Sequence, residues 1–101
     1  MSSVVAYQAT RDFDALRVCS NDWILLRPEP APPDHTVILC RYCGEVTVGI
    51  YRVTEKGPAL QLLDAGEPVV IRKDDDFRVI GAVVGTRKGP SFPDLRECHA
   101  M

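Results

Sequence analysis

Short runs of β-branched and aromatic residues recur along the whole chain, and Pro, Gly and Asp interrupt them every few residues. No stretch keeps the 3.6-residue apolar period of an amphipathic helix for four turns, whereas alternation with a period of two is common. The sequence therefore predicts a mostly β fold made of short antiparallel strands joined by hairpins. The predicted strands are residues 4–9, 23–27, 36–42, 45–53, 59–63, 68–72 and 77–87.

The length of 101 residues suits a single domain built around one core. The hydrophobic and charged fractions, 46% and 26%, match ordinary soluble globular proteins, which argues against global disorder and against a membrane protein. We expect one compact β domain over residues 1–88 and a C-terminal tail over residues 89–101. Within that tail, residues 95–99 have the pattern of one helical turn.

The charge distribution argues against direct binding of nucleic acid. The net charge is -2, and the 12 basic residues are scattered singly or in pairs instead of forming a patch. The first ten residues lack the basic start and apolar run of a secretion signal, and no apolar run has the length of a membrane span. We therefore expect a cytoplasmic protein whose cysteines are reduced thiols.

Two of the four cysteines offer a possible metal site. Cys40 and Cys43 have the CxxC spacing by which zinc ribbons present two thiolates at a hairpin tip, and Cys19 or Cys98 with His99 could complete the ligand set. The alternative is that Cys40 is a small buried apolar residue and Cys43 a turn residue. We favour this second interpretation, and the sequence predicts no cofactor.

Two longer phrases resemble a known family. Residues 44–52 read GEVTVGIYR, and residues 75–87 read DDFRVIGAVVGTR. They resemble two strands of the LexA-like domain found in the C-terminal half of phage and bacterial repressors, a β-clip related fold. The proline-rich loop at residues 27–35 also has the place of a loop in that family. The resemblance implies a LexA-like β domain.

In that family, a serine attacks a peptide bond and a neutral lysine on the first of these strands removes the serine proton. Gly49 stands at the lysine position, and alternation places Gly49 on the more polar face of its strand. Residues 16–26 resemble the serine region but are shortened, which leaves Ser20 as the one candidate nucleophile. Arg52 stays protonated, and Lys56 lies in a predicted turn, so neither replaces the lysine.

The resemblance therefore implies a non-enzymatic relative that acts as a protein-interaction or dimerisation module in transcriptional regulation. The expected partner is a second copy or a repressor-like protein. Two alternatives remain: a self-cleaving serine peptidase with a displaced nucleophile at Ser20, and a zinc module at Cys40 and Cys43. The family dimerises through its final strand, so the expected interface residues are Phe77, Val79, Ile80, Val83 and Val84.

Overall fold

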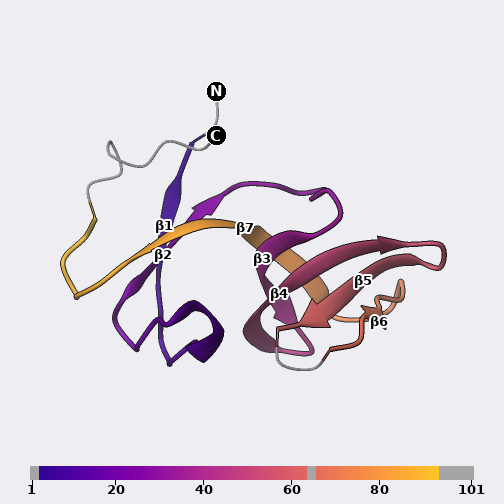
Figure 1. The fold of residues 1–101 in the computed structure, drawn as a ribbon, viewed down its shortest axis with the longest axis horizontal. Helices are drawn as coiled ribbons and strands as arrows, with labels where there is room; N and C mark the ends of the chain where they lie inside the picture. The colour runs from indigo at the N-terminus through magenta and orange to yellow at the C-terminus, as the bar shows by residue number, and fades with distance from the viewer. Residues whose placement is uncertain (1–2, 64–65, 94–101) are drawn as a thin grey trace.

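The computed structural model describes residues 3–63 and 66–93, which form one seven-stranded antiparallel sheet (Figure 1). The prediction of a mostly β, single antiparallel domain is confirmed. None of the described segments forms a helix long and apolar enough to cross a membrane. The elements in chain order are β1 (Val5–Gln8), the 3-10 helix η1 (Asp14–Leu16), β2 (Trp23–Arg27), β3 (Thr36–Tyr42), β4 (Glu45–Thr54), β5 (Gly57–Leu62), β6 (Val69–Val70) and β7 (Phe77–Arg87).

The strand boundaries follow the sequence pattern closely. β2, β3 and β7 have the predicted limits, and β1, β4 and β5 differ from prediction by one or two residues at an end. β6 is shorter than predicted because only Val69 and Val70 pair with β5. The predicted turn that contains Lys56 is tight, since Gly57 pairs with Thr54 and already belongs to β5.

The last strand lies in the middle of the sheet. The spatial order is β1-β2-β7-β3-β4-β5-β6, so β7 pairs with β2 on one side and with β3 on the other. Figure 1 shows β7 as the long orange strand that crosses between β2 and β3. The strands β1 and β2 therefore join the β3–β6 meander through β7.

The β3–β4 hairpin turns on Cys43 and Gly44. Tyr42 pairs with Glu45, which leaves a two-residue loop. Both loop residues have positive φ, 52° at Cys43 and 83° at Gly44, as a type I′ turn requires. This turn matches the twist of the flanking strands and sets the register of β4, which carries Gly49.

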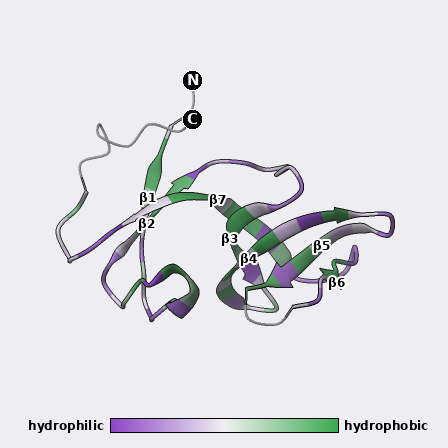
Figure 2. Cartoon of the chain, viewed as in Figure 1, coloured by the Kyte–Doolittle hydropathy of each residue, from purple (hydrophilic) through white to green (hydrophobic). Residues whose placement is uncertain are grey.

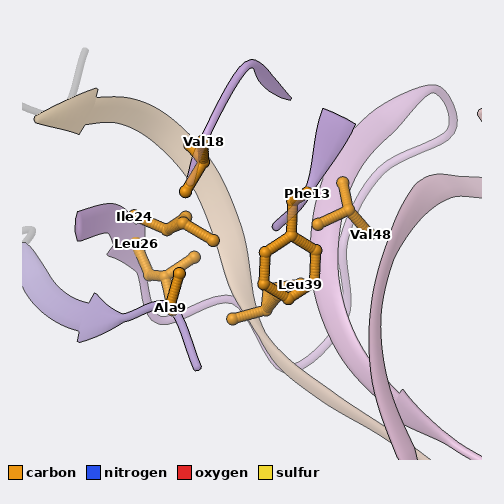
Figure 3. Packing of buried hydrophobic residues seen from close by; sticks show 7 residues of the cluster. All are labelled: Ala9, Phe13, Val18, Ile24, Leu26, Leu39 and Val48. Carbon is orange, nitrogen blue, oxygen red and sulfur yellow. The ribbon is translucent and has the colours of Figure 1, made fainter. Parts of the chain in front are cut away.

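Two hydrophobic clusters pack on opposite sides of β3, because successive residues of a strand point to opposite faces. The first cluster, shown in Figure 3, is the larger, and Phe13 packs there beside Leu39 and Val48. Its buried members are Ala9, Phe13, Val18, Ile24, Leu26, Leu39 and Val48. The second cluster has Ile38, Cys40 and Leu60 as its buried members. Figure 2 shows the hydrophobic residues running through the strands and hydrophilic residues in the connections.

Candidate functional site

Gly49 is buried on β4 between Ile38 of β3 and Leu62 of β5. A Cβ atom at this position would lie 2.7 Å from Leu60 Cδ1 and 3.0 Å from the Gln61 carbonyl oxygen. The expectation that Gly49 lies on a polar face is wrong, because β5 covers this face with Leu60. The place that a lysine side chain would need is already filled by the second cluster.

Ser20 lies in the exposed turn that leads into β2. Its backbone N–H donates to Asp12 Oδ1 at 2.8 Å, which fixes the turn. Within residues 3–63 and 66–93, the Ser20 hydroxyl has no hydrogen-bond partner that could act as a base. The arrangement therefore lacks the contact by which a serine nucleophile is activated.

The two basic residues near the Gly49 strand are also occupied or remote. The Arg52 guanidinium donates to Asp34 Oδ1 at 3.1 Å through Nε and to Gln61 Oε1 at 2.9 Å through Nη1. It thereby holds the segment before β3, and the strand β5, against β4. Lys56 lies exposed in the β4–β5 hairpin. Neither side chain is placed to accept a proton from Ser20.

The most connected polar group near Ser20 is Asp22, which sequence reasoning missed. Its carboxylate accepts hydrogen bonds from the backbone N–H of Cys19 at 2.9 Å and of Gly89 at 2.9 Å, and from Lys88 Nζ at 3.1 Å. Lys88 Nζ also donates to the Arg17 carbonyl oxygen. Asp22 thus ties the Ser20 turn to the chain that leaves β7, and Lys88 serves as its ion-pair partner.

These contacts lower the pKa of Asp22 to about 2, with the two backbone hydrogen bonds from Cys19 and Gly89 as the leading causes, followed by Lys88. Because the pKa in the folded chain is below its ordinary value of 3.8, the carboxylate stabilises the fold above pH 4. This contribution should disappear as the pH falls through about 2. We expect Asp22→Asn to lower the urea midpoint at pH 7 and to cost progressively less as the pH falls from 4 to 2. A cost that stays constant over this range would contradict the assignment.

The two cysteines of the CxxC pair lie in different environments. Cys40 is fully buried in the second cluster, and burial raises the pKa of its thiol to about 12. Cys43 is exposed in the hairpin turn, and Cys19 is exposed beside Ser20. Within the described residues, no group of three or more His, Cys, Asp or Glu side chains is placed to hold a metal ion. The remaining candidate ligands, Cys98 and His99, lie outside those residues.

This difference predicts selective thiol chemistry. In the folded protein, the exposed Cys19 and Cys43 should react with iodoacetamide within minutes at pH 8. Cys40 should stay unmodified until the protein is unfolded, because its buried thiol stays protonated and only the thiolate reacts. Peptide mass mapping before and after addition of denaturant measures the modification of each thiol. Modification of Cys40 at the rate of Cys43 in the folded protein would contradict its burial.

The expected interface residues on β7 are mostly engaged within the domain. Phe77 and Val79 pack against the second cluster, and Ile80 and Val83 pack against the first. Val84 is the exposed member, with a relative exposure of 40%. Ile80 has no partner residue in the pairing of β7 with β3, and Val84 has none in the pairing of β7 with β2. Each of these positions is a β-bulge, and bulges bend a strand. A charged residue at Val83 would therefore disturb the core as well as any contact between chains.

An open groove of about 560 Å³ lies between residues 11–15 and the start of β4, with Leu62 and Leu63 at its end. The Arg11 guanidinium lies 4.4 Å from the centre of the Phe13 ring and donates from Nη2 to the Val46 carbonyl oxygen at 2.6 Å. Arg11 thereby caps the part of the β4 edge that precedes Gly49, the first residue of β4 that pairs with β5. Neither Ser20, Gly49 nor either cysteine of the CxxC pair lines this groove.

A scan against protein-family models and a search of curated proteins both find no match. The resemblance to LexA-like domains therefore stays a prediction that rests on the quoted phrases.

Proposed function

We propose that this domain is a non-catalytic protein-interaction module. The observation that carries the proposal is the packing of Leu60 against Gly49, which leaves no room for a lysine base on β4. Ser20 lies in a turn whose neighbour Asp22 serves to join two segments of the fold. Both positions at which the resemblance would place peptide hydrolysis therefore have a structural use.

The resemblance to the regulatory half of repressors suggests the setting. The module would bind a second copy of itself or a repressor-like protein and so modulate transcription. With a net charge of -2 it would leave contact with DNA to another chain.

Two measurements on the same purified chain test this function. After prolonged incubation at alkaline pH, the intact mass should be unchanged, and a fragment that disappears in Ser20→Ala would overturn the proposal. Native mass measurement should detect a dimer, or a complex with a protein retained in a pull-down. A chain that stays monomeric at all concentrations and retains no partner would also overturn it.

A further inference from the structure

The two outer strands of the sheet, β1 and β6, differ in protection. β6 has only two paired residues and follows Pro68, which cannot donate to another strand. The free part of the β4 edge is capped by the Arg11 guanidinium at the Val46 carbonyl. β1 is the other outer strand, and residues 3–10 around it contain no charged residue and no proline. Natural edge strands usually carry such devices to prevent pairing with another chain.

The direction of the β1 backbone groups follows from the β1–β2 pairing. The Ala9 N–H donates to the Asp22 carbonyl oxygen at 2.8 Å, so Ala9 points its backbone groups toward the β2 side. Because this direction alternates along a strand, Val5 and Tyr7 also point toward β2, whereas Ala6 and Gln8 point outward. No strand of residues 3–63 and 66–93 pairs with the outer edge of β1, which therefore offers regularly spaced N–H and C=O groups.

We propose that β1 pairs antiparallel with β1 of a second copy about a two-fold axis at Ala6, which joins the two sheets into one. This inference rests on the interaction function proposed above and names its partner and surface. An isologous contact of this kind is the commonest symmetry of soluble dimers. In this register Ala6 faces Ala6 of the second copy, and Val4 faces Gln8.

The side chains favour this register. Val5 is 45% exposed and Tyr7 is partly exposed beside the first cluster. With Ala6 on the axis, Val5 of each copy faces Tyr7 of the other in a non-hydrogen-bonded pair, where β-branched and aromatic side chains stabilise a sheet. The small Ala6 side chains meet on the opposite face without a clash. No like charges face each other across the contact.

The contact is short, with about six backbone hydrogen bonds between the copies. Interfaces below about 1,200 Å² are typically weak, so the dimer should form reversibly and depend on protein concentration. Sedimentation velocity over a concentration series measures this equilibrium. A chain that sediments as a monomer up to millimolar concentration would overturn the proposal.

Charge exchange at Ala6 tests the register. In Ala6→Glu and Ala6→Lys, like charges face each other across the axis, so each variant alone should associate about tenfold more weakly or worse. An equimolar mixture should recover association, because Glu then faces Lys, and isotopic labelling of one variant lets native mass measurement identify the mixed dimer. Thermal melts confirm that both variants stay folded.

Val53→Glu and Val53→Lys are matched controls, since Val53 is an exposed strand valine on β4, away from β1. They should leave association unchanged. If the wild-type chain dimerises but the Ala6 variants do so equally well, or their mixture recovers nothing, the β1 pairing is wrong while the interaction function stands. If the wild-type chain neither dimerises nor retains a partner, both proposals fail.

Discussion

Replacing Gly49 by lysine should destabilise the domain and create no peptidase activity. The new Cβ would lie 2.7 Å from Leu60 Cδ1 and 3.0 Å from a backbone oxygen, and the backbone cannot yield as a flexible side chain can. Overpacking of this kind costs about 1–3 kcal/mol, a large fraction of the stability of a small domain. Urea unfolding at pH 7 measures the loss, and the intact mass after alkaline incubation measures the activity.

A pair of alanine substitutions separates the steric effect from the loss of a glycine. Gly49→Ala should destabilise the domain, whereas at Gly85 on β7 the same change places Cβ 3.5 Å from Leu25 Cδ1, an ordinary contact. Gly85→Ala should therefore be neutral or slightly stabilising, since it also reduces the freedom of the unfolded chain. Equal effects at the two positions would refute the argument that Leu60 fills the lysine site.

Truncation of Leu39 should have the largest effect on stability. Leu39 is fully buried in the first cluster and lies on β3, which pairs with β4 and β7. Leu39→Ala removes buried apolar surface and leaves a cavity, and such changes cost about 2–5 kcal/mol. We expect a correspondingly lower urea midpoint with an unchanged dependence on denaturant concentration.

Val53→Ala provides the control for Leu39→Ala. Val53 is also an aliphatic strand residue, but it is 57% exposed, so its truncation should change the free energy of unfolding by less than about 0.5 kcal/mol. A cost at Val53 as large as that at Leu39 would indicate that the β4–β5 hairpin is covered in solution. That outcome would contradict the assignment of the core to β3.

The sequence predicted the strands well because alternation, Gly and Pro act locally. The limits of β2, β3 and β7 were correct, and Cys43 lies in the β3–β4 turn, as its interpretation as a turn residue expected. The central position of β7 was not predictable from these signals, since pairing with β2 joins residues about sixty positions apart. The sequence pattern within one strand does not determine which other strand it will pair with.

The same limit explains the errors at the candidate site. Alternation correctly separates Gly49 from Val48, but it does not reveal that Leu60 of β5 covers the Gly49 face. Asp22 resembles an ordinary turn residue until Lys88 and Gly89 approach it from the far end of the chain. The burial of Cys40 was predicted correctly, because its position within an apolar strand is visible in the local sequence pattern.

The central position of β7 has a consequence for synthesis. While a ribosome is still producing residues 77–87, β2 and β3 have no strand to join them, and each presents an open side. The native sheet can close only after this segment has left the exit tunnel, and pairing between distant segments is slow. Until then the nascent chain exposes unpaired strands that can bind other chains, so its vulnerable period lasts until β7 has emerged.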